Sequence, residues 1–182
     1  MVERVPGCPS PAEILFDGQG IAHVRAQDES TLWFALGYLH ARDRFFQMDL
    51  ARRTAEGRLS ELIGPRGLQS DRSMRTWRIA AAAQTQSSRL EASERWVLEA
   101  YTDGVNAALA RHGRWISPET WLTGIDPEPW AVEDCLSLGL LYHLAMSPAM
   151  GEELVRAVEL ARLDRDRAVE LWGWSSEEAD RW

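Results

Sequence analysis

The sequence predicts an α+β fold that is mostly helical and carries a β-hairpin near its N-terminus. Three observations support this prediction: an alternating pattern around a glycine-rich turn at 12–25, apolar residues at helical spacing after Asp28, and a continuously apolar segment at 135–146. With 182 residues, of which 45% are hydrophobic and 26% charged, the chain is long enough to bury the core of one domain.

The segment 12–25 predicts two antiparallel strands joined by a tight turn. The turn has the sequence DGQG at 17–20, and the strand after it alternates small or apolar residues with His23 and Arg25. Because an isolated hairpin is only marginally stable in water, we expect this hairpin to belong to a larger sheet.

A long helix is predicted to follow the hairpin. Asp28 or Ser30 can cap its N-terminus, and apolar residues recur at helical spacing to about Leu62, where a Gly-Pro pair ends the pattern. Asp43 falls within the apolar stripe of this helix. An unpaired carboxylate is expensive to bury, so we expect a neighbouring arginine to neutralise it.

The remaining chain predicts further helices. After an irregular stretch at 70–77, a second helix is marked by spaced apolar residues and ends near His112. Proline and glycine residues at 118–129 predict turns before a third helix. Because this helix is apolar on nearly every face at 135–146, it is expected to be buried on all sides. The tail at 151–182 predicts two or three short, charged helices.

The composition excludes several classes of function. The formal net charge is −8, and this excess of acidic residues argues against nucleic acid or an anionic membrane as a partner. The sequence has no lysine, which excludes lysine chemistry. Cys8 and Cys135 are too few for a disulfide framework, and Cys135, in an apolar run, is expected to be a buried, inert thiol.

The sequence has neither the apolar leader of a signal peptide nor an apolar run long enough to span a membrane. We therefore expect a cytoplasmic protein. The alternative is a periplasmic or secreted protein whose signal has been removed.

Familiar catalytic signatures are missing, including GxSxG, HExxH and GxxxxGK. His23 and His40 are interpreted as hydrogen-bonded structural residues, and His112 as a solvated helix end. His143, in the third helix, is either a satisfied core histidine or a residue that lines a pocket. The residues alone therefore indicate no self-sufficient active site.

Several segments occur in the order found in one known family. They are GYLHARDRFFQMDLARR at 37–53, GRLSELIG at 57–64, DG at 17–18 with GIAHV at 20–24, Asp71 with Arg75, YTDGVNA at 101–107, and Trp130 with Asp134. Together they cover about residues 12–160. On these segments the chain resembles the penicillin acylase family of N-terminal nucleophile hydrolases, which includes penicillin, cephalosporin and acyl-homoserine-lactone acylases.

The resemblance implies that residues 1–182 form the single α-subunit of a heterodimeric acylase that is cut from a precursor. Its hairpin at 12–25 would join the sheet of the β-subunit, and its helical part at 28–182 would complete the αββα sandwich built by that partner. The nucleophile would be the N-terminal serine of the β-subunit, because the sequence stops before any such start. The implied reaction is hydrolysis of the amide between an acyl chain and an amine in a small-molecule N-acyl substrate, with no cofactor for catalysis.

The resemblance also places one wall of the acyl-binding pocket on the third helix. The wall residues would be Tyr142, His143, Met146 and Ser147, and ordinary helix packing is the alternative. Their apolar surroundings favour an aliphatic or aromatic acyl group. In members that bind a structural calcium ion, one carboxylate would come from the position that Glu153 matches best, with Glu152 as the second choice; a solvated glutamate at a helix start is the alternative.

The motif Arg42-Asp43-Arg44, with Arg52 and Arg53, is interpreted as a buried ionic network that holds the long helix against the β-subunit, and a catalytic role is the alternative. Two other functions stay open. One is a non-catalytic helical binding module derived from this family, and the other is a single-chain hydrolase that uses its own serine and histidine. A copurifying polypeptide that begins with serine would distinguish the subunit from both.

Overall fold

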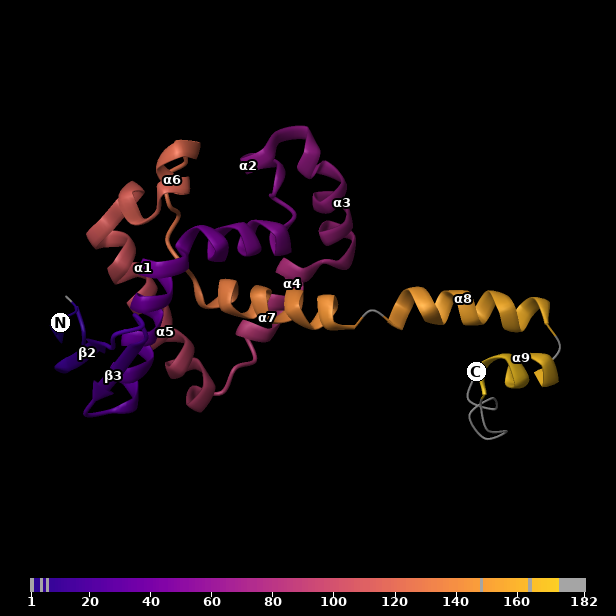
Figure 1. The fold of residues 1–182 in the computed structure, drawn as a ribbon, viewed down its shortest axis with the longest axis horizontal. Helices are drawn as coiled ribbons and strands as arrows, with labels where there is room; N and C mark the ends of the chain where they lie inside the picture. Colours follow the sequence, from indigo (N-terminus) through magenta and orange to yellow (C-terminus); the bar gives the residue numbers. More distant parts are fainter. Residues whose placement is uncertain (1, 4, 6, 148, 164, 174–182) are drawn as a thin grey trace. The chain divides into compact units, whose positions relative to one another are not determined.

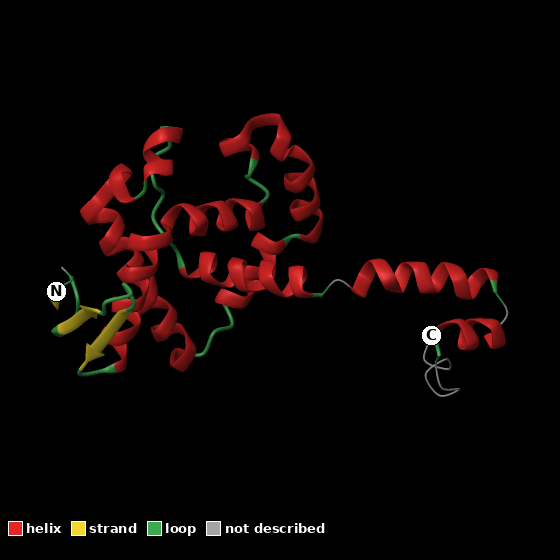
Figure 2. Ribbon diagram, in the orientation of Figure 1, coloured by secondary structure: helices red, strands yellow, loops and turns green. Residues whose placement is uncertain are grey.

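The computed structural model describes residues 2–3, 5, 7–147, 149–163 and 165–173, among which helices predominate and strands occur only near the N-terminus (Figure 1, Figure 2). The chain divides into two compact units, 1–141 and 142–182, and each is described by itself. None of the described helices combines the length and the apolar character needed to cross a lipid bilayer.

The first unit begins with a three-stranded antiparallel sheet. Its strands, in sheet order, are β1 (Val2–Glu3), β2 (Ala12–Phe16) and β3 (Ala22–Ala26). β2 and β3 form the predicted hairpin, with Ile14 opposite Val24, whereas β1 lies outside the prediction. Asp17 holds the turn, because its Oδ1 accepts hydrogen bonds from the backbone N–H groups of Gln19 and Ile21, each at 2.9 Å.

The helix α1 (Glu29–Glu56) begins where the sequence predicts. Asp28 caps it, and its Oδ1 accepts a hydrogen bond from the N–H of Thr31 at 2.7 Å. The prediction of one helix to Leu62 was wrong. Gly57 ends α1 earlier, with a φ of 68°, a left-handed conformation that glycine adopts without strain, and the short helix α2 (Ser60–Ile63) follows.

The helix α5 (Ala92–His112) packs closely along α1 and confirms the predicted second helix. Two glycines allow this close approach. A Cβ added at Gly37 would collide with the backbone of Tyr101, and one added at Gly104 would collide with the backbone of Phe34. The hydrophobic core therefore lies between these two helices and the sheet, and it includes Ile14, Phe34, Tyr38, Phe45, Val105 and Trp130.

Shorter helices connect the longer ones. They are η1 (Gly64–Gly67), α3 (Leu68–Trp77), α4 (Ile79–Ser87), η2 (Gly113–Ile116) and α6 (Pro118–Thr123). The stretch at 70–77, predicted to be irregular, is helical. Its polar residues have a structural use, because the buried carboxylate of Asp71 accepts hydrogen bonds from the N–H groups of Leu59 and Ser60 at 2.7 and 3.0 Å and so caps α2.

The apolar helix α7 (Val132–Met146) occurs where the third helix is predicted, but the expectation of burial on all sides was wrong. Among its described residues only Asp134 and Ser137 are buried, and Met146 is 82% exposed. The described part of this chain therefore leaves much of the apolar surface of α7 uncovered.

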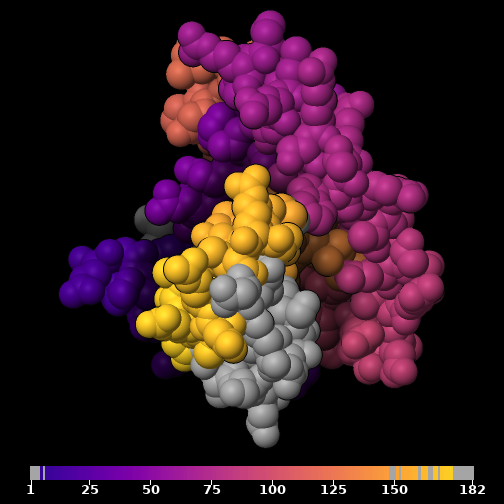
Figure 3. Space-filling view, turned by 90° about the vertical axis from the view of Figure 1, so that its right-hand side faces the viewer, coloured from indigo at the N-terminus to yellow at the C-terminus, as the bar shows by residue number. Residues whose placement is uncertain are grey.

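The second unit contains α8 (Ala149–Arg162) and α9 (Arg165–Trp172), which confirm the predicted short, charged helices. Figure 3 shows one face of this unit in orange to yellow. Leu154, Val155, Val158 and Leu171 are exposed on it.

We expect Gly104→Ala to destabilise the fold by about 3 kcal/mol, because the added methyl group forces α1 and α5 apart. Gly139→Ala is a matched control. Its Cβ meets nothing within 4 Å, so we expect a gain of about 0.5–1 kcal/mol from helix propensity. Urea unfolding followed by circular dichroism measures both changes, and equal stabilities of the two variants would contradict the close packing.

Candidate functional site

Two of the histidines discussed from the sequence form hydrogen bonds with side chains that are not candidate nucleophiles. His23 Nε2 lies 3.2 Å from Asp17 Oδ2, and His40 Nδ1 lies 3.1 Å from the hydroxyl of Tyr101. These contacts confirm that both are hydrogen-bonded structural residues. The expectation of a solvated His112 was wrong, because this side chain is half-buried and its Nε2 is buried without a hydrogen-bond partner in the structure.

A buried ionic network is centred on Asp49 of α1. Its Oδ1 accepts hydrogen bonds from Nη2 and Nε of Arg52 at 2.5 and 3.1 Å, and its Oδ2 accepts one from Nε of Arg53 at 2.8 Å. All three side chains are less than a tenth exposed. Burial alone would lower the pKa of Arg52, but the carboxylates of Asp49 and Asp134 outweigh this effect and raise the pKa, so the guanidinium stays charged.

The network extends from this buried centre towards the surface. Arg53 also pairs with Glu61 and, at 3.3 Å, with Glu128. Arg58 pairs with the same two carboxylates, at 3.0 Å to Glu61 and 2.6 Å to Glu128. The hydrogen bond from Arg58 lowers the pKa of Glu128. These pairs tie α1 to α2 and to the segment that precedes α7.

The start of α7 is fixed by side chains of α1 and α5. Arg52 Nη1 donates to the carbonyl of Pro129 at 3.0 Å and to Asp134 Oδ2 at 3.1 Å, and its guanidinium lies 4.9 Å from the ring centroid of Trp130. Asn106 of α5 accepts a hydrogen bond from the N–H of Trp130 at 2.7 Å and donates one to its carbonyl at 2.9 Å. The backbone that enters α7 is therefore held from two sides.

The predicted burial and ion pairing are confirmed for Arg52 and Arg53, whereas the burial of Asp43 was wrong. The contact of this network with a β-subunit stays a prediction. Asp43 is half-exposed and pairs at the surface with Arg42, whose Nε donates to Oδ1 at 2.7 Å. Arg44 has a non-helical φ of −143° and ψ of 21°, which kinks α1 at this residue. The apolar stripe counted from the sequence is not the buried face of this helix, since Leu32, one of its residues, is exposed.

The predicted acyl-pocket residues lie at the end of α7 and directly after it. Tyr142, His143, Met146 and Ser147 are all exposed in the structure. Large apolar groups exposed to water are typical of a surface that contacts another molecule. The contacts of this chain do not test their role, so the pocket wall stays a prediction.

Glu153, the predicted calcium ligand, is exposed in α8. Within the ranges that the structure describes, no group of three or more His, Cys, Asp or Glu residues is placed to hold a metal ion. A calcium site at Glu153 would thus need further oxygen ligands, and it too stays a prediction.

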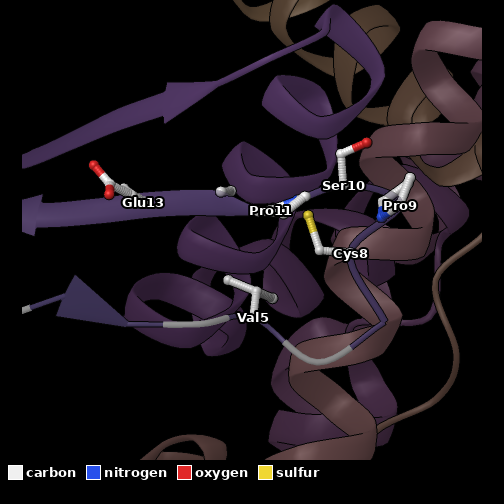
Figure 4. Close-up of a pocket in the computed structure, with 7 residues that line it drawn as sticks. Val5, Cys8, Pro9, Ser10, Pro11 and Glu13 are labelled. Carbon is white, nitrogen blue, oxygen red and sulfur yellow. The ribbon is translucent and has the colours of Figure 1, made fainter.

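A cavity of about 470 Å³ lies beside the N-terminal segment of the first unit. Figure 4 shows Cys8 close to Pro9 and Pro11 in this cavity, with Glu13 farther along β2. Burial raises the pKa of the Cys8 thiol, and the residues that line the cavity include no histidine to act as a base. The cavity therefore does not provide a nucleophile and base pair.

Comparison with known proteins identifies the class. The penicillin amidase family model matches residues 11–178. A penicillin acylase 2 proenzyme of a Pseudomonas species is 39% identical over 126 residues, which are 69% of this chain and 16% of that protein. An acyl-homoserine lactone acylase of Pseudomonas aeruginosa is 30% identical over 170 residues, which are 93% of this chain and 20% of that protein.

The fold supports the same class. A thermostable penicillin G acylase from Alcaligenes faecalis superposes with a TM-score of 0.67 at 26% identity, over 93% of this chain and 87% of that solved chain. These relatives are acylases, a class of amide hydrolases. The chain belongs to the penicillin amidase family, and it spans about a sixth to a fifth of the length of the curated relatives described above.

We expect Asp49→Asn to destabilise the first unit by about 3–5 kcal/mol, because Arg52 and Arg53 would stay buried without the anion they share. Asp43→Asn removes the same charge from a half-exposed surface pair and should change the stability little. Thermal unfolding of both variants measures the difference. Equal melting temperatures of both variants and the unmodified protein would contradict a stabilising role of the network.

Proposed function

We propose that this chain is the smaller subunit of an acylase that hydrolyses the amide bond between an acyl group and an amine. The proposal rests on how much of each relative this chain matches. The chain matches 87% of one solved penicillin G acylase chain, yet only 16% and 20% of the two curated relatives, one of which is a proenzyme. A subunit released from a longer precursor accounts for both figures.

The reaction requires groups that the described part of this chain does not assemble. His23 and His40 are bound to Asp17 and Tyr101, and the pKa values of Cys8 and Cys135 are raised by burial. We therefore assign the nucleophile to a larger partner chain, whose N-terminal serine would attack the carbonyl while its own α-amine accepts the proton. An oxyanion of the tetrahedral intermediate would be held by donors of that chain.

The contribution of this chain is to bind and orient the acyl group. Tyr142, Met146 and their neighbours at the end of α7 offer exposed apolar surface, which suits an aliphatic or aromatic acyl group such as those of N-acyl antibiotics or acyl-homoserine lactones.

Glu153 would supply one carboxylate to a structural calcium ion, and the partner chain would supply the other ligands. Calcium content of the two-chain enzyme before and after Glu153→Gln tests that assignment, and equal content would refute it.

The subunit proposal predicts that expression of the complete encoded polypeptide yields two chains that copurify without a covalent link. N-terminal sequencing of the larger chain should give serine, and the pair should release free amine from N-acyl substrates. Substitution of that serine by alanine should abolish the release while the two chains stay associated. A stable monomer of this chain, with no second polypeptide, would refute the proposal.

Met146→Glu should raise KM for amides of apolar acyl groups about tenfold or more, because a charge is placed against the acyl chain. Met146 is 82% exposed in this chain, so its replacement should not lower the free energy of unfolding of the chain itself. Leu122→Glu, at another exposed apolar position, serves as the control and should leave KM unchanged. Equal KM values of the two variants would show that Met146 does not line the acyl pocket.

A further inference from the structure

An apolar slot of about 240 Å³ opens on the first unit between α1, α5 and α7. Its walls come from three separate parts of the sequence, and the main residues are Trp33, Leu98, Tyr101, Trp130, Cys135 and Leu138. Trp130 is buried, and the others are half-buried with one side facing the opening. The volume is large enough for one leucine or one aromatic side chain.

The polar groups in the walls of the apolar slot are already occupied within this chain. The hydroxyl of Tyr101 lies 3.1 Å from His40 Nδ1, and Trp130 Nε1 donates to Cys135 Sγ at 3.3 Å. Burial raises the pKa of Cys135 and raises that of Tyr101 to about 12, so both groups are neutral at physiological pH. An occupant with a charge would lose its hydration and find no counter-charge in these walls.

The helix that forms one wall, α7, has more apolar surface than the described residues of this chain cover. Only Asp134 and Ser137 of α7 are buried, whereas Leu136, Leu138 and Leu140 stay half-exposed. Burial of such apolar surface is favourable in water. The segments that match this chain are only 16% and 20% of the two relatives, so a longer precursor of this kind would hold further polypeptide to cover α7.

We propose that the apolar slot binds one uncharged aliphatic or aromatic side chain of the larger partner chain. This inference rests on the proposed function, because it needs that chain to exist. It makes the slot a docking point on the first unit, formed by residues other than the predicted acyl-pocket residues at the end of α7. A small apolar molecule and a second copy of this chain are the competing occupants.

Photo-crosslinking in the assembled two-chain enzyme tests the slot directly. Leu138 is replaced, by amber suppression, with an aliphatic amino acid that carries a diazirine, and Leu122, which lies outside the slot and is exposed, receives the same residue as a control. Irradiation should join position 138 to the larger chain, and mass spectrometry should locate the adduct on an apolar side chain. Adducts from position 138 to a second copy of this chain, to solvent only or to a charged side chain would overturn the inference.

Two neighbouring positions on α5 give a matched pair of variants. Leu98→Trp fills the apolar slot, whereas Glu99→Trp adds the same side chain at an adjacent exposed residue that does not line it. We expect Leu98→Trp to weaken association of the two chains at least tenfold and Glu99→Trp to change it less than twofold, measured by the urea dependence of chain separation. Circular dichroism of each complex confirms that the helices persist. Equal association of both variants would contradict a filled slot.

The two proposals fail in different ways. If no larger chain copurifies, both the subunit proposal and this inference are refuted. If the chains copurify and hydrolyse an amide, but 1 mM indole abolishes the crosslink at position 138, the slot is open to small molecules and only this inference is refuted. Retention of the crosslink in the presence of indole supports it.

Discussion

The shared carboxylate of Asp49 is the interaction on which the first unit depends. Two guanidinium groups, those of Arg52 and Arg53, are each only 2% exposed, and Asp49 bonds to both. Burial of one such charge without a partner costs several kcal/mol, so the three side chains must fold as a set. Because Arg52 also bonds to Pro129 and Asp134, this requirement links the C-terminal end of α1 to a segment about 80 residues later in the sequence.

This link matters for function through the start of α7. Arg52 from α1 and Asn106 from α5 hold the backbone on either side of Trp130, and the close packing of α1 on α5 at Gly37 and Gly104 keeps those two helices at a fixed distance. The helix α7 buries few of its own residues, so the hydrogen bonds and the ion pair at its first turn fix its direction. Its exposed apolar residues then remain available for a substrate or a partner chain, which is the basis of both proposals made above.

Much of the fold could be predicted because the relevant signals are local. The turn at 17–20, the cap at Asp28 and the spaced apolar residues of α5 each specify an element through neighbouring residues. The end of α1 at Gly57 was missed because a left-handed glycine cap and the continuing apolar pattern give conflicting signals. The helix α3 was missed because its polar residues have partners distant in sequence, such as Asp71 with Leu59 and Ser60.

The candidate site was predictable only in part, for a physical reason. A run of arginines indicated an ionic network, but its buried anion is Asp49 and not Asp43, because the buried face of α1 is not the apolar stripe counted from the sequence. The burial of α7 was overestimated because apolar composition does not say which residues the described part of the chain covers. Composition alone does not distinguish a core helix from an interface helix.

We propose that this chain supplies structure and substrate contacts while the reacting group belongs to another polypeptide. The most direct measurement is an amide hydrolysis assay on residues 1–182 produced alone, with circular dichroism to show that the helices have formed. We expect a helical protein with no release of amine from phenylacetyl, long-chain acyl or glutaryl amides, and hydrolysis that appears only after the larger chain is added. Turnover by the folded chain alone would contradict it.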